Sequence, residues 1–520
     1  MQVKTTLFND DAIGSNYAFY HAWKTSLLRQ IKAGTASQTC LELIGRLATF
    51  SWFNFNGLLA DFELEQSLCA IGQQAGVQFR ECRQDHTINR VLHVASELYG
   101  TGGHTRVLMN WLSSDKARTQ AVLLLRRTKK LPDIVESRSR NAAVLVDMLH
   151  QSSIAGRVAE ATRYINAFKP DLVILHTHPD EVLTPILFGR QRGFRVIAYN
   201  HADHVFWLGA SVVDAVVDFR ECGRRFTRRF RGIDEGFVLP YPMESLPDIS
   251  RETARKSLQI CDQRTVLLTM ASEHKLIPFR DANFFEFADE LLDRVPQAQL
   301  YVIGIPNSRN SLLRGRRNSD RINLLGVIEN PLLWCAAADF FLEPTPLCTG
   351  LAAFDVLRHG ARLIQGWREY SIYGEGVAGI LPPELSGTVL GKHSQRDSLS
   401  QFADSIVQDM SRESNRQSYT SFWDSLTCNN YSKKLDALYT DLSDIPPRLM
   451  PRTIQPESLH SAEASSYADY CNSIWPPTDC LEQTIFYLLR EACRLDSGIY
   501  RHIRLLDRGF RWLGRKISGS

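Results

Sequence analysis

From residue 90 onward, runs of consecutive apolar residues alternate with amphipathic stretches, and this alternation predicts parallel β-strands joined by helices. Continuous Val, Ile and Leu runs are typical of strands that are covered on both faces of a sheet. In the first half we predict strands at 91–96, 121–125, 171–176, 195–200, 214–220 and 236–240, with a helix over 158–168. In the second half we predict strands at 265–270, 299–305, 322–327, 339–344 and from Leu363, with helices over 283–294, 330–338 and around Asp355.

This pattern divides the chain into five segments. Residues 1–88 show helical spacing of apolar positions and predict a helical accessory segment. Residues 89–245 and 246–440 each hold one series of strands and helices, so we predict an α/β protein with two facing Rossmann-like lobes of parallel sheet. Residues 441–477 are rich in Pro and Ser and predict a linker, and residues 478–520 predict two amphipathic C-terminal helices.

Composition narrows the class of protein. The 520 residues leave room for two or three domains, with 44% hydrophobic and 22% charged residues as in soluble globular proteins. A formal net charge of +3 does not call for a nucleic acid partner. The 11 cysteines lack the spacing of a metal site or disulfide framework, and no apolar run suits a signal peptide or a membrane span. These features predict a cytoplasmic protein.

A glycine-rich loop follows the first predicted strand, where Gly102 and Gly103 would let the backbone approach a ligand closely. Dinucleotide binding is disfavoured, because the third glycine of that fingerprint is replaced from His104 onward and strand 121–125 ends in arginines rather than an acid. The alternative is a tight turn capped by Thr105. His104 is a candidate base at this position.

A second polar loop, Asn200 to His204, directly follows a buried strand. His201, Asp203 and His204 offer a base with an orienting partner. They also offer metal ligands if His176 and His178 join them in space, although the spacing matches no zinc pattern. A capping or core role for one of the histidines is the structural alternative.

Two loops in the second half are suited to an anion. Lys275 follows strand 265–270 and could neutralise phosphate oxygens, the alternative being a solvated loop lysine. A polar turn ending in Thr349 and Gly350 opens a helix at Leu351 and Ala352, a weak signal that any parallel strand–loop–helix unit offers. Asp355 lies one turn into that helix and suits a ribose. Val327 and Ile328 could present backbone groups to a base edge.

Together these segments resemble a known family. The order EHKLIP, VPQAQLYVIG, NLLGVIENPLLWCAAADFFLEP and DVLRHGARLI over about residues 262–380 resembles the donor-binding lobe of GT-B glycosyltransferases. Residues 346–357 are most similar to the O-GlcNAc transferase group, and the lobe is also similar to glycosyltransferase family 4-like enzymes. The stretches YGTGGHTRV and NHADHVFWLG resemble the acceptor lobe of bacterial members. The resemblance implies that Lys275 contacts the diphosphate and Asp355 the uridine ribose.

The chain departs from the family pattern in two places. Retaining members carry two glutamates eight positions apart; the second corresponds to Asp355, but the first falls on Leu347, while Glu343 is out of register. This favours an inverting mechanism and leaves the stereochemistry open. The O-GlcNAc transferase group also has hydroxyl residues in the phosphate loop, where this chain has 351–353 (Leu-Ala-Ala), so Thr349 and backbone amides would have to serve.

The resemblance implies a metal-independent glycosyltransferase that uses a nucleotide-diphosphate sugar, with no other cofactor, and a glycan, glycolipid or protein as acceptor. A bacterial surface glycan or a lipid-linked precursor fits this expectation. The basic amphipathic stretch 498–517 is suited to peripheral contact with the inner membrane, or alternatively to packing on the lobes. Two alternatives remain at this point: a sugar-nucleotide 2-epimerase of the same fold, and a non-catalytic protein that binds nucleotide or glycan.

Overall fold

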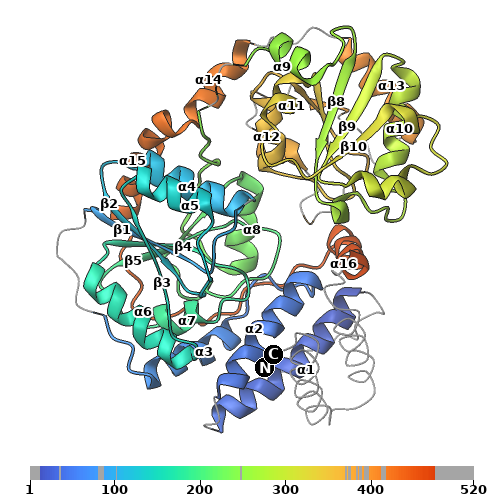
Figure 1. Ribbon diagram of the computed structural model, residues 1–520. Coiled ribbons are helices and arrows are strands. Elements are labelled where there is room, and N and C mark those ends of the chain that lie inside the picture. The colour runs from blue at the N-terminus through green and yellow to red at the C-terminus, as the bar shows by residue number, and fades with distance from the viewer. Residues whose placement is uncertain are drawn as a thin grey trace.

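The computed structural model describes residues 12–474, except for 34–36, 80–86, 101, 246, 248, 369, 371, 373–375, 382–384, 386–388, 392–397 and 412–416 and the side chains of 417–420 and 474. The predicted C-terminal helices at 478–520, with the basic stretch 498–517, lie outside the described residues. Figure 1 shows two lobes, each built on a twisted sheet flanked by helices.

The first lobe contains a seven-stranded, fully parallel sheet in the order β3-β2-β1-β4-β5-β6-β7. All six predicted strands are present. The additional strand, β3, lies at the edge of the sheet with Leu145 63% exposed, so it lacks the continuous apolar run of a buried strand. The strands are β1 (Arg90–Ala95), β2 (Thr119–Leu124), β3 (Leu145–Met148), β4 (Leu172–His176), β5 (Arg195–Tyr199), β6 (Ala215–Asp218) and β7 (Gly236–Val238).

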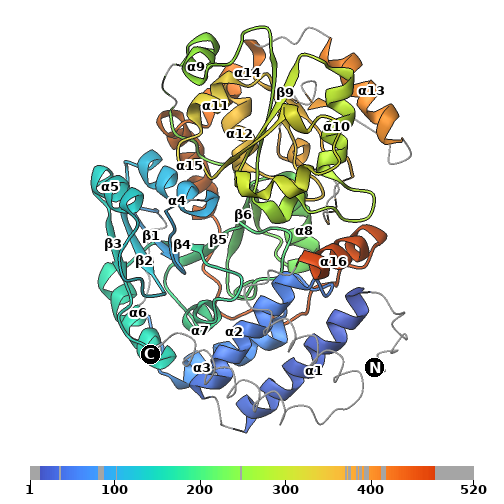
Figure 2. The ribbon, with the colours of Figure 1, turned by 45° about the vertical axis from the view of Figure 1, so that its right-hand side comes forward.

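The second lobe repeats the plan with six parallel strands in the order β10-β9-β8-β11-β12-β13. The two-residue strand β13 was not predicted. The strands are β8 (Thr265–Met270), β9 (Ala298–Ile303), β10 (Ile322–Gly326), β11 (Phe340–Leu342), β12 (Arg362–Ile364) and β13 (Val389–Leu390). Two facing Rossmann-like lobes are therefore confirmed (Figure 2).

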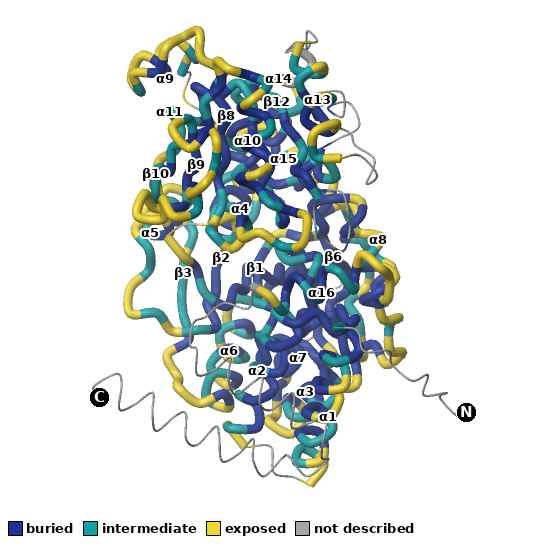
Figure 3. Tube along the Cα trace, turned by 90° about the vertical axis from the view of Figure 1, so that its right-hand side faces the viewer, coloured by how far each residue is buried: buried dark blue, intermediate teal, exposed yellow. Residues whose placement is uncertain are grey.

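Helices on both faces of each sheet bury the strands, as Figure 3 shows by the dark interior of both lobes. In the first lobe these are α4 (Gly103–Ser114), α5 (Asp133–Asn141), α6 (Ile154–Phe168), α7 (Leu183–Phe188) and α8 (Glu221–Arg231). In the second lobe they are α9 (Arg251–Leu258), α10 (Phe284–Arg294), α11 (Leu332–Ala337), α12 (Leu351–Leu357) and α13 (Leu399–Met410).

Local sequence explains where these helices begin and which face they bury. In α6 the buried residues Ile154, Val158, Ala161 and Ile165 recur at helical spacing and form one apolar stripe. The hydroxyl of Ser153 accepts a hydrogen bond from the Gly156 amide and caps the first turn. The predicted helix 158–168 is confirmed, with one additional turn at its start.

The N-terminal segment is helical, as predicted, and packs on the first lobe. Its helices are α1 (Ala12–Lys32), α2 (Gln38–Phe53) and α3 (Phe62–Gln74), of which α3 lies against α7 and α2 against α6. Their apolar faces share one hydrophobic cluster with β1, β2, β4 and β5. A buried hydrogen bond links the two parts, because the Ser211 amide donates to the Glu65 carboxylate over 2.7 Å. The segment is thus part of the first lobe's core.

The chain returns to the first lobe after the second one. Helix α14 (Gln417–Ser425) leads to α15 (Cys428–Ser443), which packs on α4, where the Trp111 indole donates to the Tyr439 hydroxyl over 2.9 Å. The two crossings between the lobes lie side by side, since the Met243 amide donates to Leu426 O and the Cys428 amide donates to Met243 O. Residues up to 440 were assigned to the second lobe by sequence, whereas α15 lies on the first (Figure 1).

The Pro- and Ser-rich segment 441–477, predicted as a linker, contains a helix. Its first part lies along the first lobe, where Arg452 donates to Val213 O. Helix α16 (Ala462–Ile474) then packs against α1, and the Tyr470 hydroxyl donates to His274 O in the second lobe over 2.9 Å. The segment therefore connects the N-terminal helices to the second lobe.

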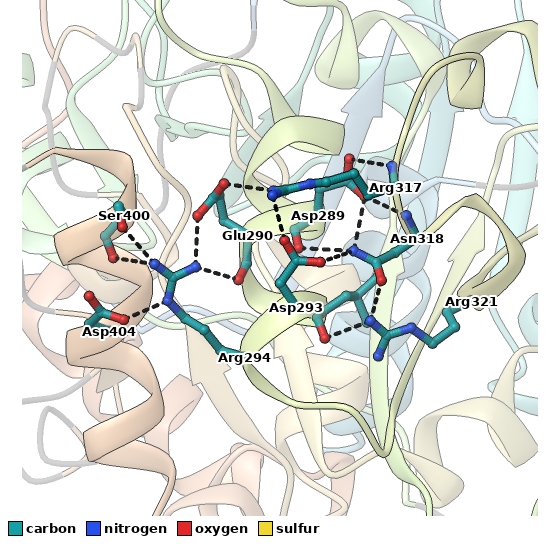
Figure 4. A network of polar contacts seen from close by, with 10 residues as sticks. Asp289, Glu290, Asp293, Arg294, Arg317, Asn318, Arg321, Ser400 and Asp404 are labelled. Carbon is teal, nitrogen blue, oxygen red and sulfur yellow. Dashed lines mark hydrogen bonds and ion pairs between the residues drawn. The ribbon is translucent and has the colours of Figure 1, made fainter.

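Polar contacts on the outer side of the second lobe hold α10 against its neighbours (Figure 4). Arg294 donates to Asp404 on α13 over 2.6 Å and to Glu290 within α10. Asn318 donates to Asp293 of α10 over 2.7 Å and to Asp289 O of the same helix, and it accepts a hydrogen bond from Arg321. These contacts join α10 to α13 and to the loop before β10, within the second lobe.

Among the described residues, no helix is both long enough and apolar enough to cross a membrane.

Candidate active site

Each sheet has one topological switch point, where the strand order reverses and where α/β proteins bind ligands beyond the carboxyl ends of the strands. In the first lobe it lies between β1 and β4, and in the second between β8 and β11. The loop after β1 and the helix opened by the loop after β11 touch each other. A Cβ atom placed on Gly103 would lie 2.9 Å from Leu351 Cδ1. The two switch points therefore belong to one interlobe region.

Glycine is required at position 102 by the backbone. Gly102 has φ 108° and precedes α4, a conformation that L side chains rarely adopt. A side chain at Gly103 would meet the end of the Leu351 side chain, which would have to shift to make room for it. The glycine loop thus brings the first turn of α4 close to the first turn of α12.

On the second-lobe side, Lys275 lies in the short 3₁₀ helix Glu273–Leu276 after β8. Its ammonium group donates to Cys348 O over 2.7 Å, so it lies against the loop that follows β11. Thr349 in this loop is nearly buried, and Gly350 precedes α12 without a side-chain cap. Lys275 thereby lies beside the loop that ends in Thr349 and Gly350 and opens α12 at Leu351 and Ala352, and the binding of a donor by these residues stays a prediction.

Asp355 has a partner that the sequence did not predict. Arg106 on α4 binds its carboxylate with both terminal nitrogens, over 2.7 and 3.0 Å, and also donates to Glu244 over 3.1 Å. Arg138 donates to the other oxygen of Glu244 over 2.6 Å, and Arg358 donates to the Glu244 carbonyl. Although burial opposes it, Arg106 and Arg138 hold the pKa of Glu244 below its ordinary value. A five-residue ionic cluster thus spans the two lobes.

We expect the Arg106–Asp355 pair to couple the lobes by about 1 kcal/mol, because the bidentate geometry is favourable but the arginine side chain is 31% exposed. Arg106→Met, Asp355→Asn and the double variant, compared by urea unfolding, give this coupling free energy. The exposed pair Lys130–Asp133 is the matched control and should show no measurable coupling. Additive effects of Arg106→Met and Asp355→Asn would contradict the expectation.

Val327 and Ile328 lie farther from this region. They follow β10, the edge strand of the second sheet, where Gly326 adopts φ 73°. Val327 is 78% exposed, whereas Ile328 packs against the large apolar cluster that runs through both lobes. The predicted contact of these backbone groups with a base remains a prediction.

Asp203 is held in a buried ion pair. Arg220 donates to both of its oxygens, over 2.6 and 2.9 Å, and the Asp203 side chain is 1% exposed. Although burial opposes it, Arg220 and His204 hold the pKa of Asp203 well below its ordinary value. Such a carboxylate suits a structural role better than proton transfer. His204 lies beside it, with Nδ1 3.4 Å from Asp203 Oδ1 and its ring near Tyr467.

His104 and His201 lie together. Their ring centroids are 4.3 Å apart, and the rings are perpendicular. His104 Nε2 donates to the backbone carbonyl of His176 over 2.7 Å, so its Nδ1 carries the lone pair when the ring is neutral, and this buried atom has no hydrogen-bond partner among the described residues. Burial and His178 lower the pKa of His104 to about 4. The geometry therefore favours these two histidines over Asp203 and His204 as proton acceptors.

The alternative of a metal site built from His176 and His178 has no support in the geometry of the described chain. No group of three His, Cys, Asp or Glu side chains there is arranged to hold a metal ion. His176 is instead hydrogen-bonded to two other imidazoles, over 3.0 Å to His93 and over 2.9 Å to His201.

Arg106, Glu244 and His93 were not predicted from the sequence. Arg106 and Glu244 are 138 residues apart and meet only because the crossing after β7 passes close to α4, so no local pattern indicates the pair. His93 did carry a signal, because it interrupts the apolar run of a strand that is otherwise Val, Leu and Ala from residue 91. A polar residue buried in a central strand needs a partner.

No family model matches the chain, and no curated protein matches it in sequence. Solved structures do match. A glycosyltransferase from Rickettsia africae aligns with a TM-score of 0.50 and 10% identity, covering 69% of this chain and 99% of the other. A variant of the Thermobaculum terrenum O-GlcNAc transferase gives 0.48 and 14%, covering 93% and 83%. The UDP-GlcNAc 2-epimerase of Neisseria meningitidis gives 0.41 and 14%, covering 68% and 100%.

At these identities the likeness concerns the fold alone. The chain has the GT-B fold, with two Rossmann-like lobes of parallel sheet facing each other.

Proposed function

We propose that the chain is a glycosyltransferase that moves a sugar from a nucleotide-diphosphate sugar to a hydroxyl group of an acceptor. The observation that carries this proposal is the meeting of the two switch points, with Lys275 and the loop before α12 on one side and His104 with His201 on the other. One side offers a cation where a diphosphate would gain negative charge, and the other offers proton acceptors.

The leaving diphosphate becomes more negative as the glycosidic bond breaks, so groups that stabilise this charge accelerate the reaction. Lys275 would supply the ammonium group, aided by the Thr349 hydroxyl and the backbone amides of residues 350–352. The Lys275 nitrogen already lies 2.7 Å from a carbonyl of this loop, which places it within reach of an oxyanion there. No divalent metal is needed for this role.

Asp355 would bind the ribose hydroxyls of the donor. In the structure its two oxygens are bound by Arg106, so the donor would have to displace this arginine or share the carboxylate with it. Glu244 lies within reach of Arg106 on the same side and could retain it. Donor binding would then loosen one link between the lobes.

A base is needed to remove the proton of the acceptor hydroxyl, and in an inverting transfer it acts from the face opposite to the leaving group. The candidates are His104 and His201, because each has a ring nitrogen free to accept a proton and both have pKa values lowered by burial. Both imidazoles are thus neutral at pH 7. We propose an inverting transfer to a glycan, glycolipid or protein acceptor.

We expect one nucleotide-diphosphate sugar from a panel of UDP-, GDP- and ADP-sugars to raise the melting temperature by several degrees. At a concentration of about 100 times Kd, binding to the native state contributes about 2.7 kcal/mol. A CMP-sugar, which has a single phosphate, is the matched control and should give a smaller shift. Differential scanning fluorimetry measures the effect. No stabilisation by any diphosphate sugar would contradict the proposal.

The same experiment leads to the assays that separate the rival functions. Incubation of the stabilising sugar without an acceptor would give slow hydrolysis for a transferase and an isomeric nucleotide sugar for an epimerase. Binding with neither product would identify a non-catalytic protein.

A further inference from the structure

Three histidines and one glutamine form a continuous hydrogen-bonded chain beneath α4. The Nε2 atom of His93 lies 3.2 Å from the side-chain oxygen of Gln120, and His93 Nδ1 lies 3.0 Å from His176 Nε2. His176 Nδ1 lies 2.9 Å from His201 Nε2. The chain crosses four neighbouring strands, from the start of β2 through β1 and β4 to the loop after β5. It crosses the switch point between β1 and β4 and ends at His201, whose ring lies beside that of His104.

The orientation of Gln120 is fixed by its other contacts. Its side-chain nitrogen donates to the carbonyls of Leu112 and Asp115, over 3.2 and 2.5 Å. A flipped amide would place its oxygen against both carbonyl oxygens, which is unfavourable. The oxygen of Gln120 must therefore face His93 and accept a hydrogen bond from it.

This orientation determines the protonation of every ring in the chain. His93 carries its proton on Nε2, so its Nδ1 accepts from His176 Nε2–H, and His176 Nδ1 in turn accepts from His201 Nε2–H. Neutral rings are required by this pattern, and burial lowers the pKa of all three imidazoles. The lone pair of His201 is then left on Nδ1.

We propose that Gln120, His93 and His176 are positioning residues that fix His201 as the Nε2–H tautomer, with Nδ1 as its proton-accepting atom. This inference rests on the proposed function in one respect, because it assigns His201 Nδ1 as the atom that receives the acceptor's proton. In a catalytic triad, a third residue orients the histidine base and stabilises its protonated form. Gln120, His93 and His176 would have this role toward His201.

The wild-type chain tests the first part directly. In ¹⁵N-histidine NMR spectra at pH 7.5, we expect His201 Nε2 to carry a bonded proton and Nδ1 to show the shift of an unprotonated nitrogen. His93 and His176 should show the same tautomer. A proton on Nδ1 of His201, or on both of its nitrogens, would overturn the proposal whether or not the chain transfers sugars.

Gln120→Met tests whether the glutamine sets the tautomers of all three histidines. It removes the hydrogen-bond acceptor of His93, so each ring could then carry its proton on either nitrogen. In each of the three rings, we expect the ¹⁵N chemical shifts of Nδ1 and Nε2 to approach each other, because the two tautomers become mixed. The change should occur in His93, His176 and His201 alike. Trp111→Phe is the matched control: Trp111 packs against His93 and His176 but is not part of the chain, so the tautomers should persist. A change at His93 with none at His201 would overturn the chain.

Two variants of His176 test whether its hydrogen bond with His201 affects activity. An asparagine oxygen can occupy the place of His176 Nδ1 and still accept from His201, whereas leucine cannot. With UDP-GlcNAc as donor and water as acceptor, we expect His176→Leu to lower kcat about tenfold with little change in KM, and His176→Asn to restore most of the loss. Equal loss in both would overturn the positioning role. A wild-type chain that turned over no sugar of the UDP-, GDP- and ADP-sugar panel would count against the proposed function, while the NMR result would still decide the tautomer.

Discussion

Lys275→Ala is expected to lower kcat about 100-fold with little loss of stability, because it removes a positive charge from the place where the leaving diphosphate becomes more negative. The lysine is half-buried and donates to Cys348 O in a loop, and it belongs to none of the hydrophobic clusters that form the core. The measurement is turnover of the stabilising nucleotide sugar at saturating concentration, together with the melting temperature of the variant.

The matched control is Lys256→Ala, which removes an exposed lysine from α9 of the same lobe and should leave both quantities unchanged. If Lys275→Ala turned over the saturating donor at the wild-type rate, its role at the diphosphate would be refuted. A fall in activity that paralleled a fall in melting temperature would instead indicate a structural role.

Arg220→Met is expected to destabilise the chain by about 3–5 kcal/mol, because it leaves the buried carboxylate of Asp203 without its cation. The two side chains are 7% and 1% exposed, so water cannot replace the lost contacts. Urea unfolding measures the loss. The control Arg224→Met removes an ion pair with Glu221, which lies three residues earlier on the same helix. The Arg224 side chain is 48% exposed, so we expect this variant to lose less than about 1 kcal/mol of unfolding free energy.

The pH dependence of this difference follows from the lowered pKa of Asp203. A carboxyl group whose pKa is lower in the folded than in the unfolded state stabilises the fold at pH values above the unfolded pKa of about 3.9. The unfolded chains share one pKa for Asp203, so the difference in stability between wild type and Arg220→Met depends on the two folded states. Burial without the cation raises the pKa of Asp203 in the variant, so the difference should be largest at pH 8 and shrink as the pH falls through that raised pKa. A loss that grew on acidification would contradict this explanation.

The parallel strands of both lobes could be predicted because they are covered on both faces and therefore carry long apolar runs, as in β4 and β8. The same rule explains the strands that were missed. β3 lies at a sheet edge with Leu145 exposed, and β13 has two residues, so neither shows a long apolar run. The return of α15 to the first lobe could not be predicted, because its partner α4 lies about 320 residues earlier in sequence.

For the site, sequence identified the loops but not the pairing of their side chains. Lys275 and the loop 343–350 both follow strands at the switch point, so their proximity could be predicted from topology. Asp203 looked like an available carboxylate because its partner Arg220 comes 17 residues later, after another strand. The bond from Arg106 to Asp355 depends on how the two lobes face each other, which no local pattern encodes.

The return of α15 and the segment after it has a consequence for synthesis. The Trp111 indole and the Arg452 contacts to Val213 show that the first lobe completes its core with residues from the far end of the described chain. A ribosome releases these residues only after the entire second lobe has emerged. The second lobe can fold while the chain is being made, but the first must wait with an uncovered apolar face, and it is this lobe that a chaperone would have to protect.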